Sequence, residues 1–232
     1  KEYSLEQHGF ARDMDFHLVS SDENTLWYEL KSDAETLAKY PYAFTLKIGY
    51  KLTGNKIQVM WEVSNNDNKT MYFQIGAHPA FYYPDFNPDT EERGAFRLYK
   101  RGENGEMKPL ETLKYILISE KGCADTEHVY ELETPEGKLP LTTSTFDRDA
   151  LIIENQQVSK VVLESCAGEP FVSVEFDSPA LGMWSPAGLN APFVCIEPWY
   201  GRCDRKGFTG PLDEKDLVNA LAPGQVFRTG YT

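Results

Sequence analysis

The chain has 232 residues, of which 41% are hydrophobic and 13% aromatic, which is enough for one large domain with a proper core. Its formal net charge of −13 and pI near 4.8 argue against nucleic acid or an anionic membrane as a partner, because both call for a basic face. No run approaches the ~18 consecutive apolar residues of a membrane-spanning helix. No signal peptide is recognised either, so a cytoplasmic protein is expected.

The cysteines are Cys123, Cys166, Cys195 and Cys203. They show no C-x-x-C spacing and no paired spacing with histidine, so neither a metal site nor a disulfide framework is expected. Cys195 lies in an apolar run and is interpreted as a small buried hydrophobe. No cofactor is indicated, and the oligomeric state stays open.

The first unusual segment is residues 7–12, with the sequence Gln-His-Gly-Phe-Ala-Arg. In an extended chain His8, Phe10 and Arg12 lie on one face. They would present an imidazole, an aromatic ring and a guanidinium to one space, the kind of surface that binds sugars. The alternative places Phe10 in the core and Arg12 in a surface ion pair.

Regular structure is predicted to be almost entirely β. A short helix is expected after the capping-box spacing at residues 32–35, ending at Tyr40-Pro41. Alternating residues 43–52 and 56–63 predict a hairpin of two long strands. Residues 102–137 are polar and irregular, which predicts a long excursion over the sheet.

Further short alternating runs predict additional strands, separated mostly by turn residues. They are residues 71–75, 95–99, 151–154, 160–164, 171–176 and 225–231. A second short helix is predicted over residues 213–221. The pattern indicates one all-β domain over residues 1–232, built as an antiparallel sandwich or barrel with one or two short helices.

His78 follows Gly76-Ala77 at the end of an apolar strand and precedes Pro79. Proline has no backbone N–H and cannot continue a central ladder, so the strand pairing should break here. Side chains at such a break tend to face clefts. The alternative is a core histidine that donates to a backbone carbonyl.

Glu197 ends the apolar run 193–196 and precedes Pro198-Trp199, which is predicted to end the strand. An unpaired carboxylate is expensive to bury, so Glu197 either has a cationic partner or lines a cleft with a raised pKa. Asp149 directly precedes the apolar strand 151–154 and could lie at the rim of the same cleft. A turn aspartate bonded to local backbone is the other interpretation.

Four segments together resemble the aldose 1-epimerase (galactose mutarotase) superfamily, most closely its bacterial aldose 1-epimerase-like branch. They are residues 7–12, 76–81, 149–152 and 195–199, in the order seen in that superfamily. The resemblance runs from about residue 3 to the C-terminus. It implies a large antiparallel β-sandwich, a supersandwich, that interconverts the α and β anomers of a free hexose.

The resemblance also implies roles for single residues. Glu197 matches the family's general base and His78 its general acid. His8 matches a histidine near the sugar ring oxygen, Asp149 a hydroxyl-binding aspartate, and Arg12 the arginine of the H-G-F-A-R motif. Family members usually carry more strands before this motif, so the chain is expected to lack N-terminal strands and one further substrate arginine.

Two other functions stay open from the sequence. A non-catalytic carbohydrate-binding sandwich needs aromatic rings and polar ligands but no acid–base pair. A hexose-6-phosphate mutarotase needs a second cationic site, which Arg202 and Arg205 could supply, although Asp204 lies between them.

Overall fold

A computed structural model describes residues 3, 5, 7–119 and 122–232 of the chain. These residues form two compact units: the first holds the chain up to Phe73 together with Ala220–Thr232, and the second holds Gln74–Asn219. That residues 1–232 make one domain stays a prediction. Among the helices of the described residues, none is long and apolar enough to cross a membrane.

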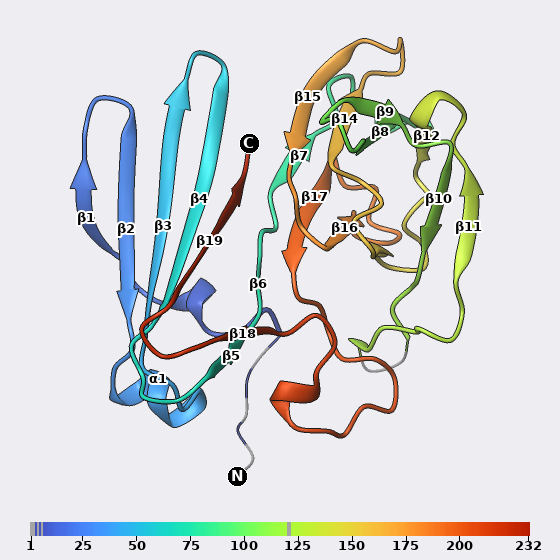
Figure 1. Cartoon of the computed structure of the whole chain (residues 1–232). Coiled ribbons are helices and arrows are strands. Elements are labelled where there is room, and N and C mark those ends of the chain that lie inside the picture. Colours follow the sequence, from blue (N-terminus) through green and yellow to red (C-terminus); the bar gives the residue numbers. More distant parts are fainter. Residues whose placement is uncertain (1–2, 4, 6, 120–121) are drawn as a thin grey trace. The chain divides into compact units, whose positions relative to one another are not determined.

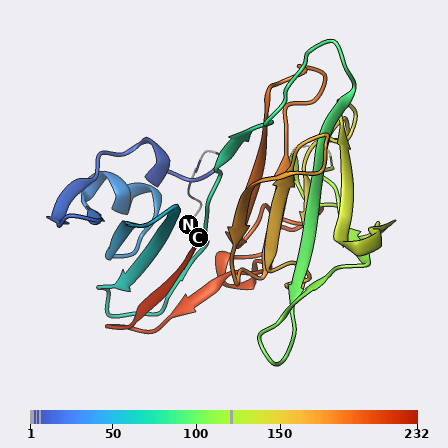
Figure 2. The same ribbon diagram turned by 90° about the horizontal axis from the view of Figure 1, so that it is seen from above.

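The first unit is built on one five-stranded antiparallel sheet with the order β1-β2-β3-β4-β19. The C-terminal strand β19 lies beside β4 (Figure 1; Figure 2). The predicted hairpin is confirmed as β3 and β4. The strands are β1 (His17–Ser21), β2 (Thr25–Lys31), β3 (Phe44–Thr53), β4 (Lys56–Asn65) and β19 (Val226–Tyr231).

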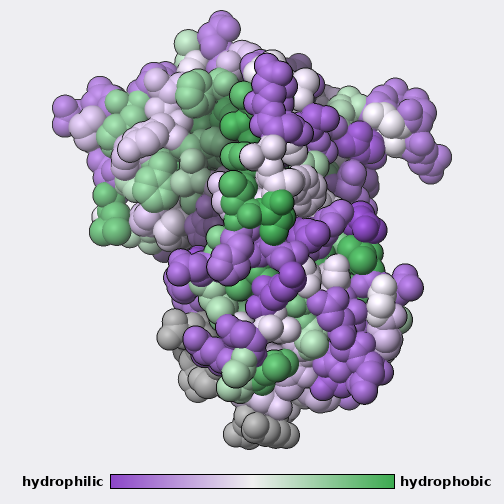
Figure 3. Space-filling view, turned by 90° about the vertical axis from the view of Figure 1, so that its left-hand side faces the viewer, coloured by the Kyte–Doolittle hydropathy of each residue, from purple (hydrophilic) through white to green (hydrophobic). Residues whose placement is uncertain are grey.

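One face of this sheet is mostly apolar. Leu46 and Trp61 are buried on it. Figure 3, seen from the side on which β1 lies in Figure 1, shows hydrophobic surface next to hydrophilic surface. Exposed large hydrophobic residues on the same face include Leu18, Leu26, Tyr50, Leu52 and Ile57. The alternation that predicted these strands therefore extends beyond the buried part of the face.

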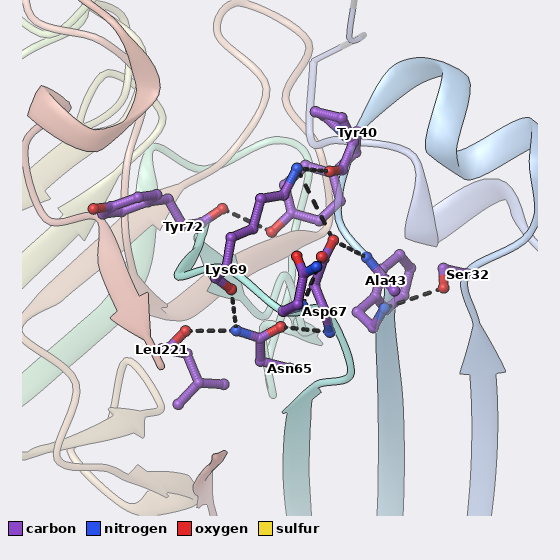
Figure 4. A network of polar contacts seen from close by, with 11 residues as sticks. Ser32, Tyr40, Ala43, Asn65, Asp67, Lys69, Tyr72 and Leu221 are labelled. Atoms are coloured by element: carbon purple, nitrogen blue, oxygen red, sulfur yellow. Dashed lines mark hydrogen bonds and ion pairs between the residues drawn. The ribbon is translucent and has the colours of Figure 1, made fainter. Parts of the chain in front are cut away.

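The turn after β4 is held by side chains rather than by a ladder (Figure 4). Asn65 donates from Nδ2 to the carbonyls of Lys69 (2.8 Å) and Leu221 (2.7 Å). Its Oδ1 accepts from the backbone of Asp67 at 2.9 Å, and Asp67 accepts from Ala43 N at 3.1 Å. The buried amide thus joins β4 to the segment that returns before β19.

The predicted helix forms as α1 (Ala34–Lys39), but its cap differs from the predicted one. The reciprocal capping bonds join Asp33 and Thr36, both at 2.8 Å, instead of Ser32 and Glu35. Ser32 Oγ accepts from Phe44 N at 3.1 Å and so is used by the neighbouring strand. The helix ends at Tyr40, as expected before a proline.

The predicted second helix over residues 213–221 is wrong. Only a 3-10 turn forms, at Leu212–Glu214, and β18 (Asn219–Leu221) pairs with β5 (Met71–Phe73). Leu217 has φ of 56°, in the left-handed region that an α-helix cannot contain. A single backbone reversal therefore redirects this segment into a strand.

The second unit contains two five-stranded sheets and a separate hairpin, all antiparallel. In one sheet β12 (Lys138–Thr142), β8 (Glu92–Arg101), β14 (Lys160–Glu164) and β15 (Pro170–Glu175) follow in order, and β9 (Met107–Pro109) pairs with β8. Phe96, Leu98, Val161 and Leu163 are fully buried on one of its faces. The pairing of β8 with β14 sets these side chains opposite one another.

The other sheet carries the candidate site. Its order is β13 (Leu151–Ile153), β16 (Ala180–Trp184), β17 (Phe193–Tyr200) and β6 (Ile75–Gly76), with β7 (Ala80–Tyr82) also on β17. Leu181, Met183, Val194 and Ile196 are buried on one face. The intervening residues, including Glu197, lie on the opposite face.

The expected irregular excursion over residues 102–137 is only partly confirmed. It contains β9 and a hairpin of β10 (Thr112–Tyr115) and β11 (Tyr130–Glu133), followed by a 3-10 turn at Pro135–Gly137. Leu113 is fully buried although its neighbours along β10 are polar. One buried position per short strand is too weak a pattern to predict from sequence.

Candidate active site

His78 and Glu197 are cross-strand partners on the second unit. β6 pairs Gly76 with Trp199, and β7 pairs Ala80 with Cys195. Continuing either register places His78 directly opposite Glu197. The Nδ1 of His78 lies 3.5 Å from Oε1 of Glu197. Opposed residues of antiparallel strands share a face and approach closely, so the register brings the two side chains together.

The prediction that strand pairing breaks around His78 is confirmed. β6 ends at Gly76 and β7 begins at Ala80. The gap is bridged by two backbone bonds, Ala77 N to Pro198 O at 3.0 Å and Ile196 N to Pro79 O at 3.3 Å. With 42% of its side chain exposed, His78 is not a core histidine.

β17 does not end at Pro198, contrary to the prediction from sequence. The strand continues to Tyr200 and pairs Pro198 with Leu181 of β16. The carbonyl of Pro198 accepts from Ala77, so its missing N–H also faces the interrupted segment between β6 and β7. Proline is tolerated in this central strand because strand pairing on that side is interrupted between β6 and β7.

Glu197 is buried, with only 4% of its side chain exposed. Burial raises its pKa to about 8, Trp199 partly opposes this by donating a hydrogen bond, and the charge of Asp149 adds to the rise. Of the two interpretations from sequence, the raised pKa fits, and the histidine opposite it supplies the ion-pair partner when protonated. A carboxyl group with this pKa can exchange a proton near neutral pH.

Trp199 fixes the orientation of this carboxyl group. Its Nε1 donates to Oε2 of Glu197 at 3.2 Å. The indole lies against two glycines of the neighbouring strands: a Cβ on Gly182 would come within 2.3 Å of the ring, and one on Gly76 within 2.9 Å. These glycines leave the space that the indole occupies, and Oε1 is left facing His78.

Trp184 completes the surroundings of His78. The two rings make an edge contact with centroids 5.5 Å apart. Trp184 is the cross-strand partner of Cys195, so it shares the face of Cys195 and Glu197. Sequence reasoning did not single out Trp184, Gly182 or the role of Trp199. The alternation along β17 could have shown that Trp199 shares a face with Glu197, because residues two apart in a strand lie on the same side.

Asp149 lies close enough to influence the pKa of Glu197. Its φ of 74° is left-handed, and its Oδ1 accepts from Ala150 N at 2.7 Å. Asp149 therefore combines both interpretations drawn from sequence, a turn residue and a neighbour of the catalytic candidates. Within the second unit the structure brings His78 and Glu197 together, and the charge of Asp149 acts on Glu197.

His8 and Arg12 belong to the first unit, and they are not part of an extended strand as predicted. His8 has a left-handed φ of 70°, and Arg12 lies in the 3-10 turn Ala11–Asp13. The Arg12 guanidinium pairs with Asp13 at 3.0 Å. Phe10 contacts the rings of Tyr40 and Phe44, each at 5.9 Å. The glycine at position 9 reverses the chain, so alternation on one face does not apply.

Arg202 and Arg205 are already engaged within the second unit. Arg202 pairs with Glu154 (2.5 Å) and Asp216 (2.7 Å), and Arg205 pairs with Asp216 at 2.5 Å. The Arg202 side chain is almost completely buried. Both guanidinium groups hold the loop after β17 in place.

Three comparisons relate this chain to known proteins. The family model described as aldose 1-epimerase matches residues 1–206. The chromosomal protein LacX of Lactococcus lactis is 29% identical over 229 residues, covering 98% of this chain and 74% of LacX.

Solved structures give the same relationship. A galactose mutarotase related enzyme from Lactobacillus acidophilus is 30% identical, with a TM-score of 0.86 and coverage of 100% of this chain and 74% of its own. A galactose mutarotase-like protein from Lactobacillus casei is 28% identical, with a TM-score of 0.87 and coverage of 100% and 76%. The predicted all-β sandwich of the mutarotase type is confirmed.

Proposed function

This chain belongs to the aldose 1-epimerase family, and on that premise we propose that it interconverts the α and β anomers of a free hexose. The observation that carries the proposal is the pair of His78 and Glu197, 3.5 Å apart, with the carboxyl group buried and its pKa raised to about 8. Mutarotation requires two groups that exchange protons at one sugar.

The proposed reaction begins with the closed sugar. The Glu197 carboxylate takes the proton of the anomeric hydroxyl while His78 protonates the ring oxygen, and the C1–O5 bond breaks to give the open aldehyde. Rotation about C1–C2 presents the other carbonyl face. Reclosure returns the proton from Glu197 to the new hydroxyl and the ring proton to His78. Every proton is restored, so neither an oxidant nor a reductant is needed.

Asp149 is proposed to bind a sugar hydroxyl, because its carboxylate lies close enough for its charge to act on Glu197. That His8 and Arg12 contact a sugar stays a prediction from their match to the family motif. Trp184 and Trp199 add apolar ring surface of the kind that sugars stack on.

A free hexose is favoured over a hexose phosphate. Binding a phosphate needs cations that are available, and both Arg202 and Arg205 already pair with carboxylates. All four cysteines are free thiols, which suits a reducing compartment, so the cytoplasm remains the proposed location.

The proposal is tested by mutating the acid–base pair. Glu197→Gln and His78→Asn should each lower kcat/KM by ~10²–10⁴-fold, about 3–5 kcal/mol of barrier, because each removes one proton-transfer group. Polarimetry with freshly dissolved α-glucose or α-galactose measures the rate. Glu169→Gln and His128→Asn, at exposed positions, serve as matched controls.

Near-normal mutarotation by either site variant would remove that residue from the mechanism. Sugar binding by the wild type without any turnover would instead support a carbohydrate-binding protein. Comparing glucose with glucose 6-phosphate tests the proposed substrate class, since faster turnover of the phosphate would contradict it.

A further inference from the structure

Three side chains with metal-binding atoms converge on the site face of the second unit. A nitrogen of His78, the Sγ of Cys195 and a carboxyl oxygen of Glu197 all lie within 4.8 Å of one another. Among the described residues, one group of three or more His, Cys, Asp or Glu side chains is close enough to hold a metal ion, and it is this one. We infer that these three residues form a binding site for a soft divalent cation of the Zn²⁺ type.

The strand register creates this set of ligands. Cys195 and Glu197 alternate on β17 and share one face, while His78 lies opposite Glu197 across the broken strand. Ligands at ordinary Zn–N, Zn–O and Zn–S lengths around a tetrahedral ion are ~3.2–3.7 Å apart. The His78–Glu197 distance of 3.5 Å is already in this range. The Sγ of Cys195 lies no more than 4.8 Å from the other two ligand atoms.

The surroundings suit coordination through Oε1 of Glu197. Oε2 accepts the hydrogen bond of Trp199, so the carboxyl group is oriented by a second residue, as ligands of metal sites commonly are. Imidazole, thiolate and carboxylate together match Zn²⁺ better than Mg²⁺ or Ca²⁺, which prefer oxygen ligands alone.

Access and charge also fit a reversible ligand. Cys195 is 1% exposed and Glu197 3%, whereas the side chain of His78 is 42% exposed, so an ion would enter from the side of His78. Three protein ligands leave a fourth position for water. A divalent ion would compensate for the negative charge of the buried thiolate and carboxylate together.

Such an ion would inhibit the enzyme rather than assist it. This consequence rests on the proposed function, because the cation would occupy the two groups that must exchange protons with the sugar. The cation site could not be predicted from residue spacing, since the histidine lies far along the chain from the other two ligands.

Direct binding is tested with Co²⁺ as a spectroscopic substitute for Zn²⁺. The wild-type protein should bind one Co²⁺ per chain with thiolate-to-cobalt charge-transfer absorption, and Zn²⁺ should displace it. Cys195→Ala should abolish that absorption, and His78→Asn or Glu197→Gln should weaken binding at least ~10-fold. Cys166→Ala, which removes an exposed thiol, should leave the absorption unchanged.

Two results would overturn the site: charge-transfer absorption that persists in Cys195→Ala, or no uptake of Co²⁺ by the wild type at 1:1 to tenfold excess. Near-ultraviolet circular dichroism checks that each variant is folded. Should Cys195→Ala fail to fold, anomalous diffraction from a Zn²⁺-soaked wild-type crystal gives the answer, since density away from Cys195 would contradict the inference.

The activity measurement separates the two proposals. Zn²⁺ should inhibit wild-type mutarotation with the same midpoint as binding, and a chelator should reverse it. A protein that binds Co²⁺ through Cys195 but does not accelerate mutarotation would keep the site and refute the proposed function. An active enzyme that binds no cation would keep the proposed function and refute the cation site.

Discussion

At the scale of single residues, the hydrogen bond from Trp199 to Glu197 sets the balance between burial and ionisation. Burial favours the neutral carboxyl group, and the indole N–H favours the carboxylate. The proposed base must be ionised to accept a proton. Its usable fraction therefore rises as pH passes through about 8.

The wild-type kcat/KM should accordingly have an acidic limb, on which it increases with pH up to about 8 and then levels off. Trp199→Phe keeps an aromatic ring but removes the N–H donor. Since a hydrogen bond to a charged group contributes ~1.5–3 kcal/mol, the limb should move up by about one pH unit or more. The pH profile of mutarotation, measured by polarimetry, checks this.

A loss of rate at every pH without a shift of the limb would mean that Trp199 acts only through packing. Trp184→Phe is the matched control, because its ring contacts His78 and no hydrogen bond joins it to Glu197 among the described contacts. Its limb should stay in place.

At the scale of elements, local contacts and backbone conformation decide where helices and strands begin and end. Asp33, not Ser32, caps α1, and a left-handed Leu217 prevents a second helix. In β17, Pro198 is accommodated because the neighbouring strand is interrupted at Ala77–Pro79. The same interruption leaves the side chain of His78 partly exposed beside Glu197.

The capping assignment can be tested by stability. Asp33→Ala should lower the free energy of unfolding by ~1 kcal/mol, because the backbone N–H of Thr36 loses the carboxylate that accepts its hydrogen bond. Glu35→Ala should cost only a few tenths of that, since Glu35 forms an exposed i,i+4 pair with Lys39. Urea denaturation of both variants gives the comparison. Equal losses would restore the capping box predicted at Ser32 and Glu35.

At the scale of the whole molecule, the buried carboxyl group links stability to pH. The pKa of Glu197 rises from 4.5 to about 8 on folding. Between these values the folded state keeps a proton that the unfolded state has released, so stability falls as pH rises. The full effect is on the order of 5 kcal/mol, at 1.36 kcal/mol per pH unit.

Glu197→Gln cannot ionise, so it should escape this loss. The difference in free energy of unfolding between the variant and the wild type should grow in favour of the variant from pH 5 to pH 9. Denaturant unfolding across that range measures it, and titrating groups that do not interact with Glu197 cancel in the difference. Glu169→Gln should show no such trend, and a flat difference for Glu197→Gln would mean that the carboxyl group is not strained by burial.

Much of the local structure could be predicted from sequence, because alternation and turn residues act over a few neighbours. The hairpin of β3 and β4, the break at Pro79 and the end of α1 followed from such patterns. Where prediction was wrong, a competing local contact decided the outcome. Asp33 and Thr36 formed the capping box in place of Ser32 and Glu35, and the turn at Gly9 removed the extended face of His8 and Arg12.

The sequence by itself determined the all-β class and marked His78, Asp149 and Glu197 as chemically unusual, since each is a titratable group beside apolar strands or prolines. Only the tertiary structure decided that His78 faces Glu197, that Trp199 holds one carboxyl oxygen, and that Cys195 joins them. Those relations depend on strand register and on loss of solvent around a side chain. Both arise from residues far apart in the chain, so no local pattern contains them.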